Sequence, residues 1–140
     1  MVKAFIAFRE QSNKEHTMIK KLTESEAGSL INTFDLADDG TAFVLQDKGS
    51  IIGQLFVENA NDNSNSLRML LISVLAEYYR TSAAKTLLDK AFSEAKKNNQ
   101  STVELIVRKD NLRAIAFYEK NSFKNEGDFT KKTLFFVKKV

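Results

Sequence analysis

The sequence contains no cysteine, no proline and no tryptophan, and only one histidine and five glycines among 140 residues. Without cysteine the chain has no disulfide scaffold, no thiol nucleophile and no cysteine-based zinc site. The lone histidine, His16, excludes a site built from several histidines, so we expect no metal centre. The absence of proline and the scarcity of glycine exclude collagen-like and proline-rich disordered chains.

Long apolar runs are also missing, since none approaches the roughly 20 residues that a membrane-spanning helix requires. The first nine residues meet a charge too early for a signal peptide, and no small-residue cleavage site follows them. A chain of this length can bury one substantial core. We therefore predict one cytoplasmic domain over residues 1–140, with no membrane association.

Charge is distributed unevenly along the chain. Residues 1–66 carry six Lys/Arg and ten Asp/Glu, a net charge of −4, whereas residues 67–140 carry fifteen and eight, a net charge of +7. A basic half suits an anionic partner, although scatter over a solvated surface is an open alternative. The lysines occur mostly in pairs and form no run of five, which makes nucleic acid an unlikely ligand despite a pI near 9.1.

Hydrophobic periodicity predicts an alternation of strands and helices. An apolar stretch over residues 67–75 suits a strand buried on both faces, and residues 59–66 read as a polar loop. In the helix after Asp110 or Asn111, the side chains of Leu112, Ile115, Ala116 and either Phe117 or Tyr118 are expected to point inward. Strands are predicted at 2–8, 16–22, 41–46, 50–57, 67–75, 103–107, 123–129 and 133–137, and helices after the capping box at 23–26, over 84–95 and from 110 or 111.

This order predicts an α/β (α+β) fold with a mixed sheet, in which residues 67–107 form one parallel crossover. The turn between the buried strand and the second helix is a candidate anion site, because a helix N-terminus offers backbone amides and a positive dipole end. Arg80 and Lys85 add charge there, and Thr81 and Ser82 add hydroxyl groups. An ordinary capped turn remains the alternative.

Residues 107–123 resemble the closing motif of the GNAT acyl-CoA N-acyltransferase superfamily. That motif joins a strand to a helix opened by asparagine, and the match rests on Asn111, Ala114, Phe117, Tyr118, Glu119, Lys120 and Phe123. Anchored on Leu87 and Leu88, the family's phosphate loop falls on residues 79–84. The resemblance covers about residues 18–138 and implies a single GNAT-like domain with a mostly antiparallel sheet flanked by helices. Residues 1–12 would then form an additional N-terminal strand.

Three positions depart from the family pattern. Tyr79 replaces the usual Gln or Arg of the phosphate loop, and Ser82 replaces a glycine that permits close approach of the pyrophosphate. Ser122 replaces the glycine before the closing Phe123, and we expect Asn121 to supply the left-handed helix end instead.

The resemblance implies an N-acetyltransferase that moves an acetyl group from acetyl-CoA, as cosubstrate, to a primary amine on a small molecule or a protein. Tyr118 would protonate the departing thiolate, while Asp35, Asp38 and Asp39 are candidates for attracting the amine. No carboxylate on the 67–75 strand offers a general base. The residues implied in cofactor binding are Ile72, Ser73, Val74, Tyr79, Arg80, Thr81, Ser82, Ala83, Ala84, Lys85 and Asn111.

Two other functions remain open. Ser82 and the unassigned base also suit a GNAT-fold protein that binds CoA as a regulatory module with weak or no catalysis. A small basic nucleic-acid-binding domain is the third hypothesis, although the strands lack exposed clusters of aromatic and basic residues. The phenylalanine-rich C-terminal strand, together with the first strand, suggests a homodimer.

Overall fold

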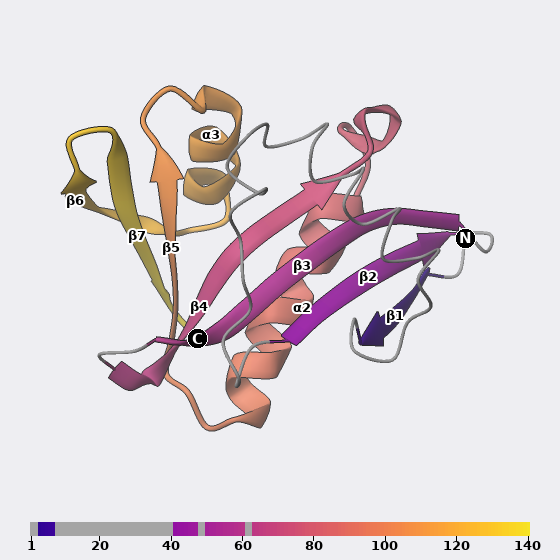
Figure 1. The fold of residues 1–140 in the computed structure, drawn as a ribbon, viewed down its shortest axis with the longest axis horizontal. Helices are drawn as coiled ribbons and strands as arrows, with labels where there is room; N and C mark the ends of the chain where they lie inside the picture. Colours follow the sequence, from indigo (N-terminus) through magenta and orange to yellow (C-terminus); the bar gives the residue numbers. More distant parts are fainter. Residues whose placement is uncertain (1–2, 8–40, 48–49, 61–62) are drawn as a thin grey trace.

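The computed structural model describes residues 3–7, 41–47, 50–60 and 63–140 (Figure 1). The strand expected at 16–22, the helix after 23–26 and the three aspartates proposed to attract the amine lie outside these residues. The described elements are β1 (Lys3–Ala7), β2 (Thr41–Asp47), β3 (Ser50–Ala60), β4 (Asn63–Val74), the 3-10 turn η3 (Ala76–Tyr78), α2 (Ala83–Lys97), β5 (Thr102–Arg108), α3 (Leu112–Lys120), β6 (Lys124–Thr130) and β7 (Thr133–Lys139).

The strands form one mixed sheet of seven strands in the order β1-β2-β3-β4-β5-β7-β6. Among the described strands, only β4 and β5 pair in parallel, and α2 is the connection between them, so the predicted crossover is present. The N-terminal strand is also present, as β1, and it pairs with β2 at the edge of the sheet. The predicted α+β class with a mixed, mostly antiparallel sheet is therefore confirmed.

Residues 59–60 and 63–66 are strand, not part of the loop that their polar composition suggests. β3 continues to Ala60 and β4 begins at Asn63, because the backbone ladder between them extends through Asn59 and Leu67. Gln100, between α2 and β5, donates from Nε2 to Oδ1 of Asn59 over 2.6 Å and so pairs the side-chain carbonyl oxygen of that residue. Backbone pairing and this contact outweigh the local preference for a turn.

Helix α2 lies against one face of the sheet and supplies much of the core (Figure 1). Leu87, Leu88, Ala91 and Ala95 are fully buried along one stripe of the helix, as its periodicity predicts. Gly53 on β3 allows this close packing, because a Cβ atom there would lie 2.8 Å from Cδ1 of Leu87. This contact lets α2 pack closely against β3.

Helix α3 packs inward only part of the face expected, since Ile115 lies against the core as predicted but two other positions do not. Tyr118 is buried and Phe117 half-buried, but Leu112 is 74% exposed and Ala116 is also exposed, so both were wrongly placed inside. The inward face includes Ala114 and the residues three and four positions after it, Phe117 and Tyr118. Leu112 and Ala116 are four residues apart on the opposite face.

The end of α3 also differs from the expectation. Ser122 adopts a φ of 70°, whereas Asn121 has a φ of −96°, so Ser122 itself occupies the left-handed position. The amides of Ser122 and Phe123 donate to the carbonyl oxygens of Glu119 and Tyr118 over 3.1 and 3.0 Å. These bonds close the helix and direct the chain into β6.

Replacing Ser122 with glycine is expected to stabilise the fold by about 1 kcal/mol, because glycine has no Cβ penalty at positive φ. Urea denaturation measures the change. Asn121→Gly is the matched control and should destabilise, since Asn121 has negative φ and donates from Nδ2 to the Phe117 carbonyl oxygen over 2.8 Å. A less stable Ser122→Gly variant would contradict the strain assigned to this position.

Candidate functional site

The two parallel strands at the centre of the sheet separate partway along their length. β4 pairs with β5 only from Ser66 to Met69, and the last pair joins Met69 to Leu105. Both strands continue beyond this point, and β4 stays paired with β3 as far as Val74. The β5-facing edge of residues 70–74 therefore lies outside the parallel ladder, where its backbone groups border a gap.

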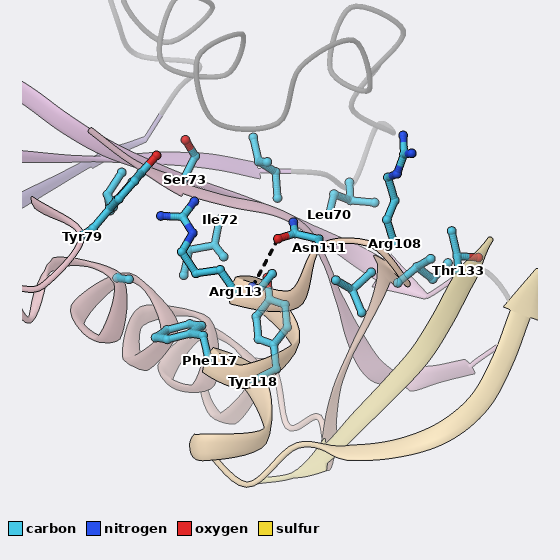
Figure 2. A pocket seen from close by; sticks show the side chains of 16 residues that line it. Leu70, Ile72, Ser73, Tyr79, Arg108, Asn111, Arg113, Phe117, Tyr118 and Thr133 are labelled. Carbon is cyan, nitrogen blue, oxygen red and sulfur yellow. Dashed lines mark hydrogen bonds between the residues drawn. The ribbon is translucent and has the colours of Figure 1, made fainter. Parts of the chain in front are cut away.

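A cavity of about 350 Å³ occupies this gap. Because it borders β4, the apolar side chains of Leu70, Leu71 and Ile72 are only half-buried, which corrects the prediction of a strand buried on both faces. Figure 2 shows the walls contributed by β4, by β5 and by α3. The lining residues are Leu70, Leu71, Ile72, Ser73, Val74, Tyr79, Ala84, Ile106, Val107, Arg108, Asn111, Arg113, Ala114, Phe117, Tyr118 and Thr133.

The turn before α2 forms one end of the site. The Thr81 hydroxyl donates to the Tyr78 carbonyl oxygen over 2.7 Å and accepts from the Ala83 amide over 3.2 Å, so it organises the turn. The first hydrogen bond of the helix ladder runs from the Thr86 amide to the Ser82 carbonyl oxygen. The amides of Ala84 and Lys85 precede that ladder, as is usual in the first turn of a helix. Ser82 has a φ of −77°, which any residue adopts without strain.

Asn111 begins α3 on another wall of the cavity. Its Oδ1 atom accepts from the Ala114 amide over 3.2 Å, so the side chain acts as the predicted helix cap. Figure 2 shows the amide nitrogen on the side away from this bond. A cap uses only the carbonyl oxygen, and the two donors on Nδ2 are the part of the side chain suited to a ligand.

Tyr118 lines the cavity from the inward face of α3 and is 7% exposed. Three aromatic rings hold it: Phe117 at 5.6 Å, Phe123 at 5.5 Å and Phe136 at 6.3 Å between ring centroids, all edge-on. Such contacts restrict the ring to one orientation. The hydroxyl of Tyr118 therefore belongs to a rigid part of the cavity wall.

Two arginines that are not among the predicted site residues, Arg108 and Arg113, also line the cavity. Arg108 makes two hydrogen bonds to Asp110, Nε to Oδ1 at 3.1 Å and Nη2 to Oδ2 at 2.9 Å, and these bonds lower the pKa of the Asp110 carboxyl and raise that of Arg108. Arg113 lies over the ring of Tyr79, with Cζ 3.7 Å from the ring centroid. The sequence carries no signal for the second contact, because only folding brings α3 beside residue 79.

The structure brings most of the predicted site residues to the cavity and leaves others on its border. Thr133, at the start of β7, lines the wall although it is not among the predicted site residues. Predicted residues that line the cavity are Ile72, Ser73, Val74, Tyr79, Ala84, Asn111 and Tyr118. Predicted residues outside its lining are Arg80, Thr81, Ser82, Ala83 and Lys85, all in the turn or the first turn of α2.

Within the described residues, no three histidine, cysteine or acidic side chains group together as a metal site would require. The same part of the chain contains no helix long and apolar enough to cross a membrane. Two ion pairs lie near the cavity. One joins Arg108 to Asp110, and the other joins Lys109 Nζ to Asp128 Oδ1 at 2.9 Å.

Comparisons with solved structures identify proteins of the same fold. An IAA acetyltransferase from Bacillus cereus superimposes with a TM-score of 0.79 at 16% identity, covering 99% of this chain and 100% of that one. Ard1 from Thermoplasma volcanium gives 0.79 at 20% identity, covering 100% and 99%. The PaiA N-acetyltransferase of Thermoplasma acidophilum, solved in complex with coenzyme A, gives 0.78 at 20% identity and covers both chains fully.

A search of curated protein sequences returned no match. The family model described as "Acetyltransferase (GNAT) family" matches residues 5–123, which include most of the sheet, α2, α3 and every residue that lines the cavity except Thr133. The split strands and the asparagine-capped helix thus lie within a match that spans most of the sequence, and the chain belongs to the GNAT acetyltransferase family.

Proposed function

We propose that this protein transfers an acetyl group from acetyl-CoA to a primary amine by direct attack. The observation that carries the proposal is the gap between β4 and β5. There the edge of β4 that faces β5 is not paired with that strand and borders the cavity. An extended, amide-containing arm such as pantetheine can pair with such an edge as an added strand. The fit is supported by PaiA, a protein of the same fold that was solved with coenzyme A.

The two ends of the cavity suit the two ends of the substrate. The first turn of α2 offers the amides of Ala84 and Lys85 to phosphate oxygens, and Asn111 offers its Nδ2 donors to the arm. Ile72, Ser73 and Val74 supply the strand edge, while Tyr118 lies at the buried end. In this arrangement Arg80, Thr81, Ser82 and Ala83 shape the turn that receives the phosphates.

The chemistry follows from this placement. The unprotonated amine attacks the thioester carbonyl carbon, so that an N–C bond forms and the C–S bond breaks. Backbone N–H groups on the edge of β4 stabilise the negative charge on the carbonyl oxygen. Tyr118 donates its hydroxyl proton to the departing sulfur and regains a proton from solvent. The described residues of the cavity wall include no carboxylate, so we assign removal of the amine's proton to water.

A CoA-binding module with little or no turnover is the second candidate. The observation that favours it is the same lack of a carboxylate among the described lining residues. The two candidates agree on cofactor binding and differ on catalysis. An assay of free thiol release with a panel of amines, including small amines, lysine side chains and protein N-termini, separates them and identifies the acceptor class.

The binding test is thermal unfolding in the presence of acetyl-CoA. With a Kd near 10 µM, roughly 1 mM ligand should stabilise the folded state by about 2.7 kcal/mol and raise Tm by several degrees. Acetate at the same concentration is the control and should leave Tm unchanged. An unaltered Tm with acetyl-CoA would overturn the proposed function.

A homodimer and a cytoplasmic location stay predictions. Light scattering would test the first, and cell fractionation would test the second.

A further inference from the structure

We propose that the side-chain hydroxyl of Ser73 binds the amine that attacks the thioester, an inference that rests on the proposed function. Ser73 lies on β4 beyond Met69, where that strand is no longer paired with β5, and it lines the cavity. The residue is only 3% exposed, and within the described part of the chain its Oγ atom has no hydrogen-bond partner. The cost of burying such a hydroxyl is removed when a ligand supplies the missing hydrogen bond.

Ser73 projects from the side of β4 opposite to the proposed proton donor. Successive residues of a strand point to opposite faces of a sheet. Figure 2 accordingly shows the Ser73 hydroxyl on one side of β4 and the side chains of Ile72 and Tyr118 on the other. A thioester held at the strand edge would have its sulfur toward Tyr118 and its other face toward Ser73. An amine that attacks from the Ser73 side therefore displaces the sulfur toward its proton donor.

The chemistry of this wall suits an uncharged amine. Ile72 and Val74 flank Ser73 with apolar side chains, and the described lining residues include no carboxylate. An apolar wall without a negative charge disfavours an ammonium ion and favours the unprotonated amine that the reaction requires. The hydroxyl of another lining residue, Thr133, is engaged in the turn between β6 and β7, where its Oγ1 atom accepts from the Thr130 amide over 3.1 Å. Ser73 offers the amine a neutral oxygen whose lone pairs no described residue uses.

The proposed contact becomes stronger as the reaction proceeds. Ser73 Oγ accepts one N–H of the bound amine, which leaves the nitrogen lone pair to form the N–C bond. The nitrogen gains positive charge as that bond forms, and a charged donor makes a stronger hydrogen bond than a neutral one. Ser73 keeps its own proton, and the proton of the amine leaves to water. The hydroxyl thus stabilises the transition state more than the bound substrate, so its loss should lower kcat more than it raises KM.

The test compares Ser73→Ala with wild type and with Ser66→Ala. Ser66 is the matched control, because it is a serine of the same strand, 1% exposed, whose Oγ also lacks a partner among the described residues but which lies outside the cavity lining. With the best amine of the acceptor panel, Ser73→Ala should lose about tenfold or more in kcat, while KM for the amine rises by only about threefold. Acetyl-CoA affinity should change by less than about twofold, since alanine keeps the backbone groups of the strand edge. Ser66→Ala should match wild type in all three values.

Thermal unfolding without ligand supplies a measurement that a structural role would change. Both alanine variants should have a Tm equal to or above that of wild type, because each removes a buried hydroxyl that lacks a partner among the described residues. Ser73→Cys nearly preserves the side-chain volume but offers only a weak hydrogen-bond acceptor. Its kcat should therefore fall as in Ser73→Ala, which separates the loss of the hydroxyl from the loss of packing.

The inference is overturned if Ser73→Ala keeps kcat within about twofold of wild type, or loses turnover together with several degrees of Tm. If wild type transfers acetyl to no amine of the panel, the proposed function fails, and ligand-observed NMR with butylamine in the presence of CoA still decides the role of Ser73. Weaker butylamine binding by Ser73→Ala than by wild type and Ser66→Ala then supports it. Equal binding, or none by any of the three, rejects it.

Discussion

Replacing Tyr118 with phenylalanine is expected to lower turnover roughly 100-fold while acetyl-CoA affinity stays nearly unchanged. The substitution removes one oxygen from a ring that three aromatic neighbours hold in place, so the shape of the cavity is kept. Without the hydroxyl, the sulfur leaves without a proton donor. Steady-state kinetics with the best amine of the acceptor panel measures turnover, and calorimetry measures affinity.

The pH dependence distinguishes a proton donor from a structural hydroxyl. In wild type, loss of the donor proton should produce a fall of kcat at high pH, and this limb should disappear in Tyr118→Phe. A structural role predicts lower stability with an unchanged pH profile. Tyr78→Phe is the matched control, because Tyr78 is half-buried beside the core and does not line the cavity. Full activity in Tyr118→Phe would remove Tyr118 as the acid.

Replacing Glu104 with leucine is expected to destabilise the fold by about 3 kcal/mol. Glu104 accepts two hydrogen bonds from Arg68, from Nε at 3.2 Å and from Nη2 at 2.9 Å, and its side chain is only 7% exposed. These residues face each other in the β4–β5 ladder, one step before the last pair, Met69 and Leu105. The ion pair therefore ties the strands together where they begin to separate.

The matched control combines Glu104→Leu with Arg68→Met. The main cost of the single substitution is that the partly buried guanidinium of Arg68 loses its Glu104 partner, so the double variant should regain most of the lost stability. Urea denaturation measures both variants. Acetyl-CoA affinity supplies a second measurement. It should fall in the single variant, because the Arg68–Glu104 pair no longer holds β4 and β5 at a fixed separation beside the cavity. A single variant as stable as wild type would show that the pair contributes nothing.

The sequence alone predicts much of the fold because its signals are local. The parallel crossover, the hairpin of β2 and β3 and the closing pair of β6 and β7 follow from hydrophobic periodicity and turn residues, and the structure confirms them. The place before an amphipathic run left Asp110 and Asn111 as candidate caps of α3, and the structure shows that Asn111 is the cap. Local reasoning failed at residues 59–66, where ladder pairing with a neighbouring strand overrides a strongly polar composition.

The left-handed end of α3 is a second feature that residue preferences alone did not predict correctly. Asn121 and Ser122 are both compatible with a helix end, and asparagine adopts positive φ more readily than serine. The structure places serine there because the amides of residues 122 and 123 must both reach carbonyl oxygens of the last turn. Hydrogen-bond geometry over several residues, not the preference of one, decides which residue bears the strain.

For the site, the sequence and its family resemblance predict which residues carry chemistry: a tyrosine and an asparagine at fixed spacing on one helix, and a turn of small and hydroxyl residues before another. The tertiary structure alone decided where the strands separate and how the cavity is walled. It alone placed Arg113 on Tyr79 and Glu104 against Arg68. Each of these contacts joins segments far apart in the chain, and only packing of the sheet against its helices brings them together.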